Sequence, residues 1–105
     1  MEKLKSKEQF QEQIQQPKTI CLFSADWCPD CRFIEPFLPQ VEEMFTQYTF
    51  VLVDRDEFID ICQEYDVFGI PSFIAFQNGK EVGRFVSKDR KTKQEIIQFI
   101  ESLPD

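Results

Sequence analysis

The sequence predicts an α/β protein with a mixed central sheet of four to five strands flanked by helices. Short apolar runs alternate with amphipathic segments in the first part of the chain, which is typical of parallel strands joined by helical crossovers. An Asn-Gly pair then separates two extended segments, which indicates an antiparallel hairpin, and a last amphipathic segment follows. The 105 residues contain no linker, repeat or low-complexity tract, so we expect one domain over residues 1–105.

A short helix and a buried strand are predicted near the N-terminus. Residues 6–16 are expected to form the helix, because Ser6 and Gln9 have the spacing of a capping box and Pro17 ends the segment. The run Thr19 to Phe23 is apolar without polar alternation. A strand that is covered on both faces has this pattern.

A long helical stripe covers residues 29–46. Its apolar residues recur at helical spacing, although Pro36 and Pro39 lie within it, and an interior proline costs about 3 kcal/mol. We therefore predict a kinked helix. Phe50 to Val53 resembles a second buried strand, and the next helix has one apolar face, formed by Phe58, Ile61, Cys62 and Tyr65.

The last part of the chain predicts a hairpin and a helix. A strand from Ser72 to Phe76 turns at Asn78-Gly79 into another strand near residues 81–86. Thr92 and Glu95 have the spacing of a capping box. The helix that they begin carries its apolar face on Ile96, Ile97, Phe99, Ile100 and Leu103.

Composition excludes several classes of function. The chain has no histidine, which excludes Ser-His-Asp and Cys-His hydrolysis and zinc sites that contain histidine. It has 12 basic and 19 acidic side chains, a net charge of −7, and no basic stripe, so neither nucleic acid nor an anionic membrane is an expected partner. The charged N-terminal residues are not followed by the apolar segment of a signal peptide, and we expect a cytoplasmic protein.

The most informative motif is Cys28-Pro29-Asp30-Cys31, which begins the long helix directly after a buried strand. Cys28 is expected near the N-cap, where free backbone N–H groups and the helix dipole favour an anion. Because the thiolate is the attacking form of cysteine, Cys28 is the candidate nucleophile. Cys31, one turn later, would resolve the mixed disulfide. Pro29 suits the first helical position and Asp30 suits the first turn.

This cysteine pair has two other interpretations: it could form a structural disulfide, or it could be half of a zinc site. A structural zinc site needs four ligands. The only other cysteines are Cys21, in a predicted buried strand, and Cys62, on an apolar helical face. We expect both to be core residues and no metal to be bound.

The chain resembles the thioredoxin family in four segments: Ala25 to Cys31, the kink proline Pro36, Gly69 to Phe73, and Phe76 to Gly79. The resemblance implies a thioredoxin fold and a dithiol–disulfide oxidoreductase. It also implies that Pro71 is cis beside the cysteines, that Ile70 docks an extended substrate segment, and that Trp27, Phe68 and Ile70 form an apolar collar around Cys28. Only the first strand of the family is weak here, at Met1 to Leu4.

Three positions depart from the family pattern. The family's buried Asp and its Lys partner are replaced by Leu22 and Leu52, and a glycine late in the last strand is replaced by Ser87. The replacement of both charged residues together is physically consistent, because replacing only one would leave an unpaired buried charge, which is costly. Without that base, Cys31 would lose its proton to water or to a nearby carboxylate, of which Asp30 is the nearest in sequence. A negative Asp30 should also oppose thiolate formation at Cys28.

The sequence therefore predicts an enzyme that reduces protein or low-molecular-weight disulfides through Cys28 and Cys31. No bound cofactor is implied, the electrons would come from a thioredoxin reductase or a small thiol, and a monomer is expected. The alternative is a binding or chaperone-like module of the same fold with redox-regulated or idle cysteines. Asp26 is expected to be a solvated loop carboxylate, and Lys88 to Lys93 a solvated turn.

Overall fold

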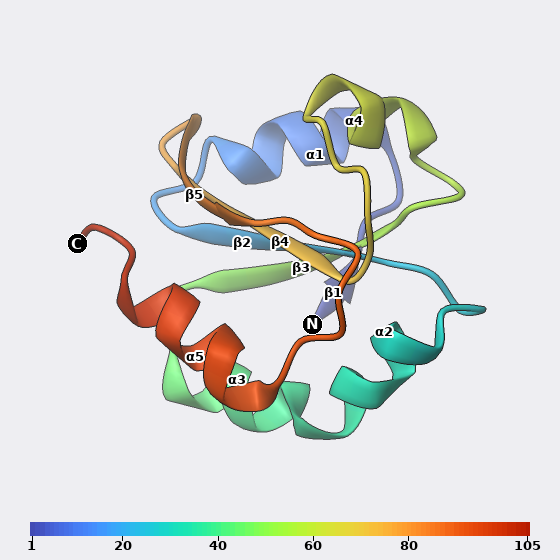
Figure 1. The fold of residues 1–105 in the computed structure, drawn as a ribbon. Helices are drawn as coiled ribbons and strands as arrows, with labels where there is room; N and C mark the ends of the chain where they lie inside the picture. Colours follow the sequence, from blue (N-terminus) through green and yellow to red (C-terminus); the bar gives the residue numbers. More distant parts are fainter.

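A five-stranded mixed sheet forms the centre of the protein (Figure 1). The computed structural model describes residues 1–105. The strand order is β1-β3-β2-β4-β5; β1, β2 and β3 are parallel, and β4 is antiparallel to both of its neighbours, β2 and β5. The strands are β1 Glu2–Lys3, β2 Thr19–Ser24, β3 Thr49–Asp54, β4 Ser72–Gln77 and β5 Lys80–Phe85. This arrangement confirms the predicted α/β class.

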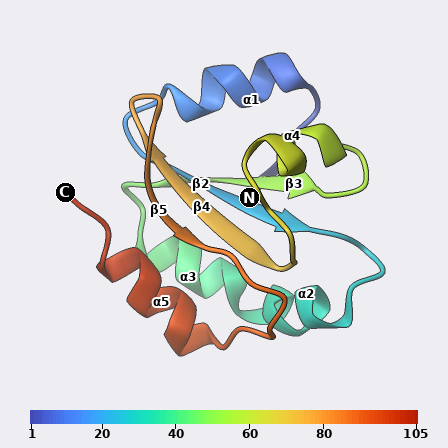
Figure 2. The ribbon, with the colours of Figure 1, turned by 45° about the horizontal axis from the view of Figure 1, so that its top comes forward.

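Helices cover both faces of the sheet. In Figures 1 and 2, α1 and α4 lie on one face, and α2, α3 and α5 lie on the other. Their bounds are α1 Lys7–Ile14, α2 Pro29–Ile34, α3 Leu38–Met44, α4 Ile59–Glu64 and α5 Lys93–Glu101. None of these helices is both long enough and apolar enough to cross a membrane.

The central strand β2 contributes to two separate cores. Cys21 and Phe23 pack with α1 and α4, whereas Ile20 and Leu22 pack with α2, α3 and α5. Successive side chains of a strand point to opposite faces, and every residue of β2 is buried. The absence of polar alternation in this strand follows from burial on both sides, as expected from the sequence.

The weak first strand does form, as two residues at the edge of the sheet. Glu2 pairs with Val51 and Lys3 with Leu52 of β3, and the Leu4 N–H donates to the Leu52 carbonyl at 2.8 Å. Both strand side chains are exposed. An apolar run is therefore not needed at this edge, which explains the faint signal in the sequence.

The helix predicted over residues 29–46 is kinked, as expected, but it ends at Met44. It is divided into α2, a 3₁₀ turn over Glu35–Phe37, and α3, which ends at Met44. Pro36 lies in the first positions of the 3₁₀ turn, where its missing N–H and its fixed φ are tolerated. Two residues of the predicted apolar stripe are not buried, since Phe33 is 44% and Met44 52% exposed.

The hairpin and the last helix agree with the sequence. Asn78 and Gly79 have φ values of 52° and 86°, and a two-residue turn with positive φ at both positions matches the twist of a hairpin. The Gly79 N–H also donates to the Ile14 carbonyl at 2.8 Å, so the turn is tied to the end of α1. Thr92 and Glu95 form the predicted reciprocal capping box of α5.

Candidate active site

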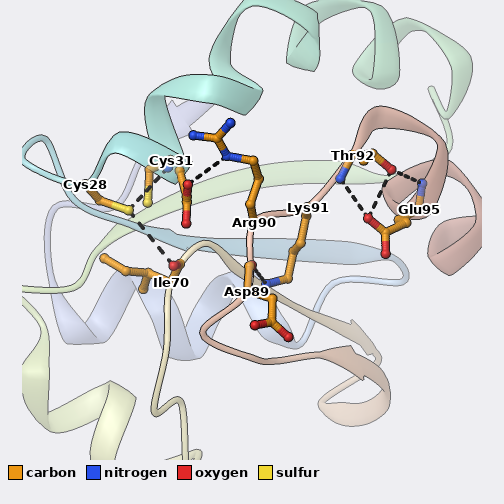
Figure 3. A network of polar contacts seen from close by, with 9 residues as sticks. Cys28, Cys31, Ile70, Asp89, Arg90, Lys91, Thr92 and Glu95 are labelled. Carbon is orange, nitrogen blue, oxygen red and sulfur yellow. Dashed lines mark hydrogen bonds and ion pairs between the residues drawn. The ribbon is translucent and has the colours of Figure 1, made fainter.

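Cys28 is the N-cap residue of α2. Its backbone is extended, and Pro29 follows at the start of the helix. The Cys31 N–H donates to the Cys28 Sγ at 3.2 Å (Figure 3). A sulfur at this position receives one of the free N–H groups of the helix and lies at the positive end of its dipole. The sulfur of Cys28, and not that of Cys31, therefore occupies the N-terminus of the helix.

Cys31 is more deeply buried than its partner. It has no exposed surface, whereas Cys28 is 5% exposed, and both thiols are free. The pKa of the Cys31 thiol is raised to about 11. Burial is the main cause, and a hydrogen bond with Cys28 adds to it, whereas a hydrogen bond with Ser24 lowers the pKa. At neutral pH Cys31 is a thiol, and its proton must leave before or during any attack by its sulfur.

The Ile70–Pro71 peptide bond is cis and lies beside Cys28. The Cys28 thiol points toward the Ile70 carbonyl oxygen at 3.9 Å (Figure 3). Ile70 packs against a small cluster formed by Ala25, Cys28 and Cys31. Two segments far apart in sequence are thereby brought together as the resemblance implied.

An open groove of about 310 Å³ runs past Cys28. Trp27 and Phe68 line it and are 58% and 65% exposed, and Ile70 contributes to its floor. All three collar residues expected from the sequence therefore meet at Cys28. Large exposed apolar side chains gathered beside a reactive group are typical of a surface that contacts a partner. The other lining residues are Pro29, Asp30, Arg55, Val67, Gly69 and Lys88.

Trp27 is held by a residue that the sequence analysis missed. Its indole Nε1 donates to the Asp56 Oδ2 at 2.7 Å. This bond is the main reason why the pKa of Asp56 is lowered from its ordinary value. The carboxyl ends of the parallel strands β2 and β3 lie side by side, so the order of strands was the signal that could have placed Asp56 near Trp27.

Asp30 is paired rather than free. Its Oδ1 accepts a bond from the Arg90 Nε at 2.8 Å. The Arg90 guanidinium also lies over the Phe33 ring, with its Cζ 4.4 Å from the ring centroid. The charge that was expected to disfavour a thiolate at Cys28 is thus partly balanced by Arg90.

The turn that carries Arg90 is largely exposed, as expected for Lys88 to Lys93, but the expectation is wrong at Lys91, which is buried. Lys91 is 1% exposed. Its Nζ donates to the Asp89 carbonyl at 3.0 Å and to the Ser87 hydroxyl at 3.1 Å, and it lies 5.0 Å from the centroid of the Phe85 ring. A buried ammonium is tolerated because acceptors surround it. Ser87, the departure from the family glycine, supplies one of them.

Leu22 and Leu52 are neighbours in the parallel register of β2 and β3. The two positions where the family has charges are therefore adjacent in this protein, and both are apolar. Leu22 is 2% exposed and belongs to the core that α2 and α3 cover. Cys21 and Cys62 are buried in the opposite core, where burial raises the pKa of Cys21 to about 12. Their expected role as core residues is confirmed.

The model of the family described as Thioredoxin matches residues 2–102. The chain belongs to the thioredoxin family. It is 38% identical over 94 residues to an H-type thioredoxin of Fagopyrum esculentum, covering 89% of this chain and 78% of that one. It is 34% identical over 94 residues to thioredoxin-1 of Saccharomyces cerevisiae, covering 89% and 91%. Members of this family are typically thiol–disulfide oxidoreductases.

A mitochondrial thioredoxin, thioredoxin-2 of Schizosaccharomyces pombe, is also similar, with 35% identity over 79 residues. That match covers 75% of this chain and 59% of the relative, so the chain spans about three fifths of the relative's length. The fold agrees with a crystal structure of thioredoxin from Trypanosoma brucei brucei, at a TM-score of 0.84 and 26% identity over 94% of this chain and 86% of that one. The Cys28–Cys31 pair is consistent with the CXXC motif of these thioredoxins.

Proposed function

We propose that this protein is a thiol–disulfide oxidoreductase that reduces protein or low-molecular-weight disulfides through Cys28 and Cys31. One observation carries the proposal. The Cys28 Sγ receives the Cys31 N–H at 3.2 Å at the start of α2 and faces an open groove with exposed aromatic side chains. A nucleophile, a second thiol one helical turn away and a surface for a partner are therefore close together.

The reaction has two exchange steps. In the first, the Cys28 thiolate attacks one sulfur of the substrate disulfide, the substrate S–S bond breaks, and one substrate sulfur leaves as a thiolate. In the second, Cys31 loses its proton and attacks Cys28, which releases the other substrate sulfur. The protein ends with a Cys28–Cys31 disulfide, and two electrons have passed to the substrate.

Ile70, Pro71, Trp27 and Phe68 would bind the substrate. The segment before the cis proline exposes backbone beside Cys28, so an extended chain could pair with it. Trp27 and Phe68 would cover the apolar side chains that flank the substrate disulfide. Pro29 and Asp30 would tune the nucleophile, the former by starting the helix and the latter by its charge.

A thioredoxin reductase or a low-molecular-weight thiol would supply the electrons, since relatives in the family typically work with disulfide substrates and a reductase. We propose the cytoplasm as the compartment, because a dithiol must be returned to the reduced state after each turnover and cytosolic thiols are kept reduced. We also propose that the protein is a monomer, in which the groove beside Cys28 stays open to substrates.

Reduction of insulin by dithiothreitol tests this function. The wild-type protein should accelerate it, Cys28→Ser should abolish the acceleration, and Cys62→Ser, which alters a cysteine of the opposite core, should retain it. Cys31→Ser should accumulate substrates on Cys28 as stable mixed disulfides. The exposed collar of Trp27 and Phe68 also suits a binding or chaperone-like module. Binding of unfolded protein that persists in Cys28→Ser, with no catalysis in the wild type, would favour that function instead.

A further inference from the structure

A second cavity, of about 270 Å³, touches Cys31 but not Cys28. The groove described above touches Cys28 but not Cys31, so the two cysteines line different spaces, although the Cys31 side chain itself is fully buried. The inner wall of the cavity is apolar and includes Leu22, Ala25 and Leu52. The space is open to solvent, since exposed residues such as Lys3, Asp26 and Glu35 also line it. It therefore brings water close to the buried Cys31.

Carboxylates surround the mouth of this cavity. Glu42 pairs with the Met1 amino group at 3.0 Å, and Asp54 pairs with Lys3 at 3.9 Å. Asp26 and Glu35 also line the cavity, are exposed, and form no ion pair. These two carboxylates are free to accept a proton. Asp30, in contrast, lines the groove and is bound to Arg90.

We propose that this cavity is the route by which Cys31 loses its proton, with water in the cavity passing the proton to Asp26 or Glu35. The inference rests on the proposed function, because it concerns the second exchange step. The volume is ample for several waters, since one water needs only about 10–15 Å³ of such space. Ser24, whose side chain is hydrogen-bonded to Cys31, and the carboxylate residues line the cavity and provide polar partners for these waters, so Ser24 connects the buried thiol to the cavity.

The Cys31 sulfur attacks the Cys28 sulfur of the mixed disulfide, the bond from Cys28 to the substrate breaks, and the Cys28–Cys31 bond forms. The proton of Cys31 passes through water to a carboxylate and then to the solvent. The substrate leaves as a thiolate and is protonated by the solvent. Solvent and surface carboxylates thus take the role of the buried base that the family has at the position of Leu22. No charge has to be buried for this.

Dithiobis(nitrobenzoate) separates the two exchange steps in a stopped-flow experiment. Attack by Cys28 releases one thionitrobenzoate, and attack by Cys31 on the resulting mixed disulfide releases a second, so the wild type should give two coloured phases of equal amplitude. Cys31→Ser should give the first phase alone. Absence of a second phase from the wild type would contradict the proposed function itself, whereas the proposal on the cavity concerns only the rate of that phase.

The decisive variant is Asp26→Asn combined with Glu35→Gln. We expect the second phase to slow by roughly 100-fold, the lower end of the usual contribution of a general base, with the first phase unchanged. The matched control is Glu8→Gln with Glu43→Gln, which removes two exposed carboxylates outside the cavity. If the two carboxylates acted only through their negative charge, their removal would favour the Cys31 thiolate and speed the second phase. An unchanged or faster second phase would overturn the proposal.

The pH profile gives an independent readout. If a base on the protein removes the proton, the second phase should be nearly flat between about pH 6 and 8, because its rate then does not depend on the hydroxide concentration. In the double variant it should rise by about tenfold per pH unit, as expected when hydroxide alone removes the proton. A wild-type profile with the steeper slope would contradict a carboxylate acceptor.

A variant that fills the cavity tests the path of the proton from Cys31, and not the identity of the carboxylate that accepts it. Leu52→Phe places a ring in the cavity from β3, and the second phase should slow while the first is retained. Formate, a small carboxylate, should restore the second phase in the Asp26→Asn, Glu35→Gln protein but not after Leu52→Phe is added. Circular dichroism verifies the fold of each variant. If Leu52→Phe fails to fold, rescue of the double variant by formate still decides the proposal, and failure of rescue counts against it.

Discussion

The Trp27 indole donates its Nε1 proton to the Asp56 carboxylate at 2.7 Å, which fixes one exposed wall of the groove to the turn that follows β3. An exposed tryptophan without such a bond would sample several rotamers and would have to be ordered each time a partner binds. Asp56 thus acts through Trp27 and has no contact with the cysteines. The bond links the collar of the groove to the rigid part of the sheet.

Asp56→Ala should lower the catalytic efficiency on protein disulfides several-fold, whereas Asp56→Asn, which keeps an acceptor oxygen, should lower it less. Trp27 is the only tryptophan, so its fluorescence anisotropy reports the loss of order directly. Glu57→Ala, which changes the neighbouring exposed acid, is the control. Equal anisotropy in Asp56→Ala and the wild type would show that the bond does not order the ring.

The same bond predicts an acid transition. It lowers the pKa of Asp56 below the ordinary value of 3.8. A carboxyl group whose pKa is depressed in the folded state contributes stability that is present above its ordinary pKa and is lost as the pH falls through the depressed value. The Trp27 signal should therefore stay constant down to pH 3.8 and change only below it, and Asp56→Asn should remove this transition.

The sequence was sufficient for features that depend on neighbouring residues. The N-cap position of Cys28 follows from a strand, a proline and a helical stripe in succession, and the turn at Asn78-Gly79 follows from two residues that tolerate positive φ. The replacement of a charged pair by Leu22 and Leu52 followed instead from the resemblance to the thioredoxin family, in which the two positions have fixed spacings from the first cysteine and the cis proline.

Features that depend on the meeting of distant segments were not predictable. The bond from Trp27 to Asp56 joins the ends of two strands, and the pair of Arg90 and Asp30 joins a late turn to α2. Lys91 is buried because Ser87 and Phe85 surround its ammonium, which charge patterning along the chain does not reveal. The cavity at Cys31 likewise lies where β2 and β3 pack against α2 and α3.

Leu22→Asp should accelerate the second exchange step and destabilise the protein. A carboxylate at this position would line the Cys31 cavity and would act as a nearer base, but it would also be a buried charge without a partner. We expect a loss of about 3–5 kcal/mol in the free energy of unfolding. Adding Leu52→Lys should recover part of it, because the two positions are neighbours in the register of β2 and β3.

Urea unfolding and the second stopped-flow phase measure these two effects separately. Leu22→Asn is the control for polarity, since it removes the same apolar contacts without supplying a base. If Leu22→Asn accelerates the second phase as much as Leu22→Asp, the effect comes from a looser core and not from proton transfer.

Lys91→Met should destabilise the protein by about 1–3 kcal/mol. The substitution keeps an apolar stem of similar length but leaves the Ser87 hydroxyl and the Asp89 carbonyl without their donor. Lys80→Met, at an exposed lysine of the hairpin, should change stability little. Urea unfolding measures both. A stable Lys91→Met protein would show that the cost of burying the ammonium cancels its hydrogen bonds.

The pair of Asp30 and Arg90 should control the rate of the first exchange step. Arg90→Gln leaves the Asp30 charge unbalanced near Cys28 and should slow attack by its thiolate, whereas Asp30→Asn leaves Arg90 and should speed it. Each change should be about two- to fivefold, as expected of a partly exposed pair, and should shrink at high salt. The double variant should lie near the wild type. If both single variants change the first stopped-flow phase in the same direction, the effect is structural and not electrostatic.

Lys88 should give the groove a preference for acidic substrates. Among the charged residues of the groove, Arg55 pairs with Asp56 and Asp30 pairs with Arg90, which leaves Lys88 without an ion pair beside the collar. A peptide disulfide flanked by glutamates should therefore react several-fold faster than the same peptide with lysines, despite the chain's net charge of −7. Lys88→Glu should reverse the order, whereas Lys80→Glu, an equal change of charge on a residue that does not line the groove, should preserve it. Equal effects of the two substitutions would show that net charge, and not Lys88 in the groove, sets the preference.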